Sequence, residues 1–202
     1  MTTENVVGNF EDKYASNNPI ARALVSGFLD AVNELFVLAH PGGKQVLEVG
    51  CGEGKLANHL VTNAPAPARY VATDLSLDTI SPGLDPRIET AQASIFDLPY
   101  ATDSFDVVVC CEVLEHVDDP SAALAEVARV ARGKVLLSTP WEPVWRAMNV
   151  ARGKYLRDLG NTPGHIQHFS RRDLEALASR HLRIAAMRKP LPWTVILGEP
   201  RR

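Results

Sequence analysis

The chain has 202 residues, of which 46% are hydrophobic and 22% are charged, and its formal net charge is −3. This length allows one well-packed core, and the balance is that of a globular protein rather than a disordered or fibrous one. The slight acidic excess argues against a protein that binds the phosphate backbone of nucleic acid, which requires a basic surface.

The number of cysteines and the lack of long apolar runs indicate in which cellular compartment we expect the protein. Cys51, Cys110 and Cys111 are too few for a disulfide framework and favour a reducing compartment. The polar stretch 1–14 lacks the apolar core of a signal peptide, and no apolar run reaches the length of a membrane span. We expect a cytoplasmic protein, monomer or homodimer, that acts on a small molecule and contacts neither nucleic acid nor membrane.

Predicted helices and strands alternate along the chain. Apolar residues spaced three or four apart after Asn18-Pro19 predict a first helix that ends near Ala39. Further helices are predicted over 55–62, 76–80, 120–132 and 170–178. Strands are predicted over 45–49, 70–73, 87–91, 105–111, 134–138, 182–187 and 195–197.

This alternation predicts an α/β fold with a mostly parallel sheet and helices on both faces. Residues 105–111 form the continuous apolar run that is typical of a central parallel strand. We expect a single domain over 1–202, with an N-terminal arm and helix over 1–40, a cofactor-binding core over 44–140 and an acceptor-covering segment over 140–170. Ligands of such sheets bind at the carboxyl ends of the strands.

The first predicted strand ends in a glycine-rich turn, Gly50-Cys-Gly-Glu-Gly54. Glu48 precedes it by two residues, and Asp74 ends the second strand, 24 residues after Gly50. A carboxylate at that second position is suited to ribose hydroxyls. A purely structural turn and a dinucleotide oxidoreductase are the competing interpretations, but Glu48 would be a poor neighbour for a pyrophosphate.

These motifs, together with Phe-Asp-Val-Val-Val-Cys-Cys-Glu-Val-Leu-Glu-His-Val over 105–117, resemble the class I S-adenosylmethionine (SAM)-dependent methyltransferases. The last segment is similar to the quinone-biosynthesis O-methyltransferases and their small-molecule relatives. The resemblance covers roughly 44–140. It implies a Rossmann-like, doubly wound sheet of seven strands, one of them antiparallel.

The resemblance implies SAM as cofactor and assigns roles to the strand ends. Glu48 would hold the amino acid end of SAM. Gly50, Cys51 and Gly52 would lie along the methionine part, and Asp74 would hold the ribose.

The remaining cofactor contacts concern the adenine. Leu75 would lie against the ring, and Ser94, Ile95 and Phe96 would form its pocket, Ser94 standing where relatives often carry an aspartate. Tyr14, in the N-terminal arm, would close over the site.

Methyl transfer requires a base that removes a proton from the acceptor. Glu112 and His116 follow the fourth predicted strand, where the resemblance implies that the methyl group lies. His165 and His168 are further candidates for proton handling or acceptor contact. Each of these four side chains also has a structural interpretation, as a partner of loop amides or a helix cap.

The segment after the fifth predicted strand mixes flat aromatic faces with polar groups, and we expect Trp141, Trp145, Arg146 and Tyr155 to contact the acceptor. The two tryptophans are four residues apart and could instead be core anchors of a helix. The Arg, Asn, Gln and His side chains around these rings suit a sugar or oligosaccharide, and the chain as a whole, including the segment 160–165, resembles methyltransferases that act on mannosides.

Other acceptors and roles remain open. A quinone or phenol is the alternative acceptor. A nucleic-acid methyltransferase and a non-catalytic SAM-binding module are weaker alternatives. A sugar hydroxyl is a weak acid, so Mg²⁺ is a further candidate cofactor, with no ligands assigned to it.

Overall fold

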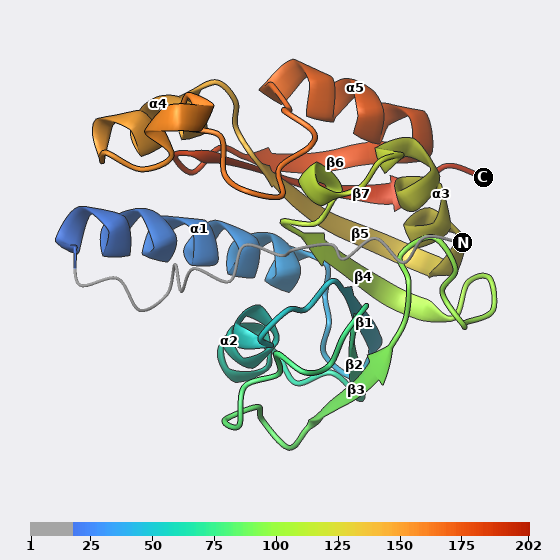
Figure 1. Cartoon of the computed structure of the whole chain (residues 1–202). Coiled ribbons are helices and arrows are strands. Elements are labelled where there is room, and N and C mark those ends of the chain that lie inside the picture. Colours follow the sequence, from blue (N-terminus) through green and yellow to red (C-terminus); the bar gives the residue numbers. More distant parts are fainter. Residues whose placement is uncertain (1–17) are drawn as a thin grey trace.

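The computed structural model describes residues 18–202, which form a seven-stranded sheet in the order β3-β2-β1-β4-β5-β7-β6 (Figure 1). The strands are β1 Gln45–Val49, β2 Arg69–Asp74, β3 Ile88–Gln92, β4 Phe105–Cys111, β5 Ala131–Pro140, β6 Leu182–Arg188 and β7 Trp193–Pro200. The helices are α1 Pro19–Leu38, α2 Lys55–Asn63, α3 Pro120–Val130, α4 Val144–Ala151 and α5 Arg171–His181, with short 3-10 turns η1 Leu114–His116 and η2 Leu156–Asp158.

The strand pairing confirms the fold predicted from sequence. β1 pairs in parallel with β2 and β4, and β7 runs antiparallel to both of its neighbours, β5 and β6. The chain first builds outward from β1 to β3 and then returns to the other side of β1 with β4. Such a reversal separates the loops that follow β1 and β4, and this is where ligands bind in doubly wound sheets.

Helices cover both faces of the sheet. One core joins α1 and α2 to the sheet through residues such as Phe36 and Leu60, and the other joins α3 and α5 to the opposite face through Leu124 and Leu174 (Figure 1). The starts of two of these helices can be predicted from the sequence, because side chains next to them in the chain cap them. Asn18 accepts hydrogen bonds at the start of α1, and Ser170 forms a capping box with Asp173 at the start of α5.

The helix predicted over 76–80 is wrong, because this segment forms a turn. The Ser76 hydroxyl accepts a hydrogen bond from the Asp78 backbone N–H and donates one to the Asp78 carboxylate. Ser and Asp side chains that bind nearby backbone groups compete with helix formation. Pro82 follows too soon for a longer helix to offset that competition.

The helix predicted over 120–132 is too long, since α3 ends at Val130 and β5 begins at Ala131. Gly133, the residue after the predicted range, does not end a helix but lies within β5. A Cβ atom at Gly133 would approach the carbonyl oxygen of Asp106 to 2.5 Å. The glycine therefore permits close approach of β5 to β4, which is a tertiary requirement.

Gly133→Ala is expected to lower the free energy of unfolding by about 1–3 kcal/mol, because the added methyl group meets backbone that cannot rotate away. Urea denaturation measures the change. Gly27→Ala in α1 is the matched control, because nothing lies within 4 Å of its added Cβ, and it is expected to stabilise by up to about 1 kcal/mol. Equal effects of the two substitutions would contradict the packing explanation.

The segment between β5 and α5 contains the helix α4, whose bounds the sequence did not reveal. β7 also begins two residues earlier than predicted, at Trp193, which pairs with Pro140. Within residues 18–202, no helix combines the length and apolar character that a bilayer span requires.

Candidate functional site

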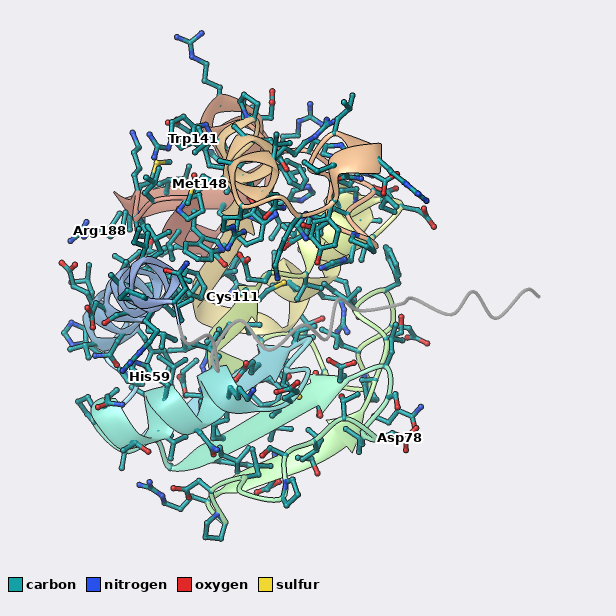
Figure 2. All side chains as sticks on the ribbon, turned by 60° about the vertical axis from the view of Figure 1, so that its left-hand side comes forward. His59, Asp78, Cys111, Trp141, Met148 and Arg188 are labelled. Atoms are coloured by element: carbon teal, nitrogen blue, oxygen red, sulfur yellow. The ribbon has the colours of Figure 1, made fainter. Side chains whose placement is uncertain are left out.

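A cavity of about 490 Å³ lies at the carboxyl ends of β1, β2 and β4 and is closed on one side by α1 and α4. In Figure 2, Met148 of α4 lies above Cys111 at the end of β4, and Asp78, in the turn after β2, lies below it. The cavity thus has one side built by the loops after β1, β2 and β3, and another built by α1 and the segment after β5.

The glycine-rich turn after β1 borders this cavity through the half-buried Gly50 and Gly52. Gly50, Gly52 and Gly54 have φ angles of 74°, 53° and 77°, which favour glycine. A Cβ at Gly50 would meet Val113 at 2.4 Å, whereas a Cβ at Gly52 would meet nothing within 4 Å. Gly52 therefore leaves open space in which a ligand can approach the main chain.

Asp74 lies at the end of β2 on the floor of the cavity and is fixed by backbone N–H groups. Its Oδ2 accepts a hydrogen bond of 2.8 Å from the Gly52 N–H, and its Oδ1 accepts a longer one of 3.4 Å from Ser76. The carboxylate is half-buried and lines the cavity. It therefore presents an oriented acceptor beside the glycine turn.

Glu48, in β1, is a buried carboxyl group that also lines the cavity. Only 2% of its surface is exposed, and Tyr70 of β2 donates a hydrogen bond of 2.5 Å to its Oε2. Burial raises the pKa of Glu48 to about 7, and the nearby negative charge of Asp74 adds to that shift, whereas the Tyr70 hydrogen bond opposes it. Burial likewise raises the pKa of the neighbouring Cys51 thiol far above its usual range, so this cysteine is a packing residue rather than a nucleophile.

Glu48→Gln is expected to stabilise the protein at high pH. A carboxyl whose pKa is raised to about 7 on folding favours the folded state most at low pH, and that contribution is lost as pH rises through about 7. The shift from 4.5 corresponds to about 3 kcal/mol. The variant should therefore gain up to about 3 kcal/mol over the wild type at pH 8, and the gain should shrink toward pH 4.5.

Thermal or urea denaturation from pH 4.5 to 8 measures this gap. The exposed Glu175→Gln is the control, and we expect its stability to stay within about 0.5 kcal/mol of the wild type at each pH. If the difference in unfolding free energy between Glu48→Gln and the wild type did not change with pH, Glu48 would ionise over the same pH range in the folded and unfolded states.

Two apolar side chains flank the far end of the cavity. Leu75 and Phe96 line it and keep 49% and 46% of their surface exposed, and Ser94 and Ile95 complete this side. The Ser94 hydroxyl accepts a hydrogen bond from the Phe96 N–H and so shapes the loop after β3. This end offers flat apolar contact with few free polar groups. Tyr14 lies outside the described residues.

Glu112 follows β4 in a left-handed conformation, with φ of 60°. Its Oε1 accepts a hydrogen bond of 2.8 Å from the Ser138 hydroxyl, and its Oε2 accepts one of 2.7 Å from Trp193 Nε1. Both carboxylate oxygens thus join β4 to β5 and β7. This geometry favours the structural interpretation of Glu112 over the role of a proton acceptor.

His116 ends the turn η1 and lines the cavity. Its Nδ1 lies 2.8 Å from the carbonyl oxygen of Gly164. A carbonyl oxygen only accepts, so Nδ1 carries the hydrogen, and Nε2 of the neutral ring holds the lone pair. The ring contacts His165, whose centroid is 4.9 Å away in an edge-to-face arrangement.

Glu115, His116 and His165 each present one potential ligand atom, and these atoms lie within 4.8 Å of one another. Glu115 is buried at 1% exposure. Two imidazoles with one carboxylate suit Zn²⁺ or Fe²⁺, whereas Mg²⁺ prefers oxygen ligands. This donor set therefore lends no support to the Mg²⁺ considered from sequence.

Aromatic rings form the wall on the α1 and α4 side. The Trp193 ring centroid lies 4.9 Å from that of Phe28 and 5.4 Å from that of Trp145, and Trp145 stacks on His165 at 6.0 Å. All four rings line the cavity. The indole and phenyl rings among them give this wall an apolar surface that a planar ligand can contact.

The indole N–H groups of this wall are bonded to the protein itself. Trp145 Nε1 donates to the Thr162 hydroxyl at 2.8 Å, and the buried Asn149 amide donates to the same oxygen at 3.1 Å. Trp193 Nε1 is held by Glu112, as described above. The two indoles therefore present carbon surface to the cavity.

The residues predicted to contact the acceptor divide into two groups. Trp145 and Tyr155 line the cavity. Trp141 and Arg146 are not among the lining residues: the Arg171 guanidinium lies 3.5 Å from the Trp141 ring centroid, and Arg146 Nε donates to the carbonyl of Leu159. Figure 2 shows Trp141 at the outer edge of the molecule.

Of the two further histidine candidates, one lines the cavity and the other does not. His165 is buried and lines the cavity, whereas His168 is exposed and its Nε2 lies 2.8 Å from Asn161 Oδ1, outside the lining. Sequence reasoning missed Tyr70, Phe28 and Trp193. Trp193 enters the cavity because β7 pairs with β5, and no local pattern around it signals that pairing.

A family model described as a methyltransferase domain matches residues 21–181. The chain is 37% identical over 111 residues to the ubiquinone biosynthesis O-methyltransferase of Hahella chejuensis, an alignment that covers 52% of this chain and 44% of that protein. It is 34% identical over 138 residues to the methyltransferase GfsG of Streptomyces halstedii, covering 65% of this chain and 49% of that protein. The chain therefore spans less than half the length of these two relatives.

Among solved structures, the chain is similar to the magnesium protoporphyrin IX methyltransferase of Synechocystis PCC 6803 with bound S-adenosylhomocysteine (SAH). The TM-score is 0.66 at 16% identity, covering 92% of this chain and 89% of that one. This likeness concerns the fold. The family match over 21–181 and the strand order together confirm the resemblance noted in the sequence: the chain belongs to the methyltransferase domain family of the class I SAM-dependent superfamily.

Proposed function

We propose that this protein is a SAM-dependent O-methyltransferase that acts on a hydroxyl group of a planar aromatic small molecule. The observation that carries the proposal is a single cavity in which the glycine turn and Asp74 adjoin a wall of aromatic rings. One side has the chemistry of a nucleoside and amino acid site, and the other has that of a flat apolar site.

The residues present fit SAM as cofactor. The open main chain at Gly52 permits close approach, the fixed Asp74 carboxylate would accept hydrogen bonds from ribose hydroxyls, and the Glu48 carboxylate would pair with the amino group. Leu75 and Phe96 would contact the adenine. Bound SAM supplies a methyl group that its sulfonium makes electrophilic.

The acceptor wall favours an aromatic ring over a sugar. A polyhydroxy ligand needs many donors and acceptors, but the indole N–H groups of Trp145 and Trp193 and the amide of Asn149 are bonded within the protein. An aromatic ring needs flat carbon surface, which these side chains supply. The named relatives include a ubiquinone biosynthesis O-methyltransferase and none described as acting on a sugar. We therefore replace the sugar favoured from sequence by a phenol or quinol.

His116 is proposed as the proton acceptor. The Gly164 carbonyl fixes the ring so that Nε2 carries the lone pair, and the side chain lines the cavity between the two sides. The buried Glu115 lies near the imidazoles of His116 and His165. A negative charge there would stabilise the imidazolium that forms when His116 takes the phenol proton.

Incubation of the protein with SAM and a panel of catechols, quinols and mannosides tests the proposal. Mass spectrometry of the products and of SAH measures methyl transfer. We expect turnover of at least one catechol or quinol and none of the mannosides, and we expect EDTA to leave it unchanged. SAM binding without transfer to any acceptor would instead support a non-catalytic SAM-binding module, and turnover of mannosides alone would restore the sugar.

A further inference from the structure

Arg152 lies directly after α4 and lines the cavity beside the aromatic wall. Its side chain is exposed, yet it is held at two points. Nε donates a hydrogen bond of 3.3 Å to the carbonyl oxygen of Met148, and Nη2 donates to Oδ1 of Asn149. The guanidinium therefore has a defined position at the rim of the acceptor side.

The hydrogen-bond partners of Arg152 are neutral groups, unlike those of the arginines that form ion pairs. Within residues 18–202, no carboxylate oxygen lies within 4.0 Å of its guanidinium nitrogens. The arginines that do form such ion pairs are Arg69, Arg87, Arg129, Arg132, Arg183, Arg188 and Arg202. The two hydrogen bonds thus fix Arg152 without neutralising its charge.

The orientation of Asn149 is itself determined by the interior. Asn149 is 1% exposed, and its Nδ2 donates to the Gly160 carbonyl at 2.9 Å and to the Thr162 hydroxyl at 3.1 Å. Because both of these neighbours accept from Nδ2, the amide oxygen must face Arg152. The same Thr162 hydroxyl holds Trp145, so one buried group positions both the guanidinium and the aromatic wall.

We infer that Arg152 binds an anionic group of the acceptor, of the carboxylate class, so that the substrate of the proposed reaction is an anionic phenol such as a hydroxybenzoate. This inference rests on the proposed function. A guanidinium has five N–H donors, and the two internal bonds leave others for an approaching anion. Arginine recognises a planar carboxylate by paired hydrogen bonds, and Trp145 and Met148, which also line the cavity, would contact the ring that bears it.

The methionine carboxylate of the cofactor is another source of the same chemistry, so the test separates the two. Titration calorimetry on the protein saturated with SAH compares 3,4-dihydroxybenzoate with catechol, for the wild type and for Arg152→Gln. We expect the wild type to prefer the dihydroxybenzoate. The substitution should weaken dihydroxybenzoate binding by about 10- to 100-fold, since a hydrogen bond to a charged group contributes about 1.5–3 kcal/mol, and should leave catechol and SAH affinities unchanged.

Two further variants sharpen the result. Arg152→Lys keeps the charge without the planar fork, and we expect an intermediate loss. Arg157→Gln is the matched control, because Arg157 is exposed in η2 and does not line the cavity, and we expect no change.

Several outcomes would overturn the inference. One is an equal loss of affinity for catechol and for dihydroxybenzoate in Arg152→Gln. Another is a variant that binds SAH more weakly but the acceptor as well as the wild type does. The third is a wild type that binds neither phenol. Failure of the proposed function is a separate result. A wild type that binds the anionic phenol through Arg152 but transfers no methyl group would retain the anion site and lose the enzyme assignment.

Discussion

Asp74→Ala is expected to weaken SAM and SAH binding on the order of 100-fold or more. The change removes the carboxylate proposed to accept hydrogen bonds from the ribose, and each hydrogen bond to a charged group contributes about 1.5–3 kcal/mol. It also removes the acceptor that holds the Gly52 N–H at 2.8 Å, so the glycine turn loses its fixed position. Titration calorimetry with SAM and SAH measures the loss.

Asp74→Asn separates these two contributions. The asparagine oxygen still accepts from Gly52, but the charge is gone, so we expect a loss smaller than that of the alanine variant. Asp30→Ala is the control, because Asp30 is exposed on α1 and does not line the cavity. Unchanged SAM affinity in Asp74→Ala, with the fold intact by circular dichroism, would remove Asp74 from the cofactor site.

His116→Gln is expected to lower kcat by about 100- to 10,000-fold, which is the typical contribution of a positioned general base. The amide can still donate to the Gly164 carbonyl, whose distance from His116 Nδ1 is 2.8 Å, but it offers no nitrogen that takes a proton. Affinity for SAM should stay unchanged, because the proposed contacts of SAM lie on the other side of the cavity. Single-turnover kinetics on the best phenol found, with calorimetry for SAM, measure both quantities.

His40→Gln is the matched control, since His40 is exposed and lies outside the cavity lining. We expect no change in its kcat. A His116→Gln enzyme with wild-type kcat would assign proton removal to another group, with His165 as the next candidate. A kcat loss accompanied by an equal loss of SAM affinity would point to collapse of the loop after β4 instead of lost base catalysis.

The geometry of the side proposed to bind the cofactor was predictable because its signals are local. Strand, glycine turn and helix follow one another between Gln45 and Asn63, and the positive φ angles of Gly50, Gly52 and Gly54 are requirements that only a few residue types meet. Asp74 was predictable because parallel strands end at one edge of the sheet, so the ends of β1 and β2 must be neighbours.

The predictions of helix bounds failed where tertiary contacts, or hydrogen bonds from side chains to nearby groups, outweighed the local helix preference. Gly133 resembles a helix stop, but the close carbonyl of Asp106 explains why a glycine is needed there. Ser76 and Asp78 hold their segment in a turn through their own side chains. Short segments such as 76–80 lack the number of backbone hydrogen bonds that would make a helix win that competition.

The sequence by itself determined the family, the sheet and the residues around the glycine turn, because each depends on periodicity or on spacing within a short stretch. Only the tertiary structure decided which side chains form the side of the cavity proposed for the acceptor. Trp145 comes from α4, Arg152 follows that helix directly, Trp193 comes from β7 and Phe28 from α1. These side chains meet through strand pairing and core packing across more than 160 residues of chain. It also separated Trp145, which lies in α4 and lines the cavity, from Trp141, which precedes α4 and packs against the Arg171 guanidinium, because sequence spacing alone does not specify where that helix begins or which of its faces turns inward.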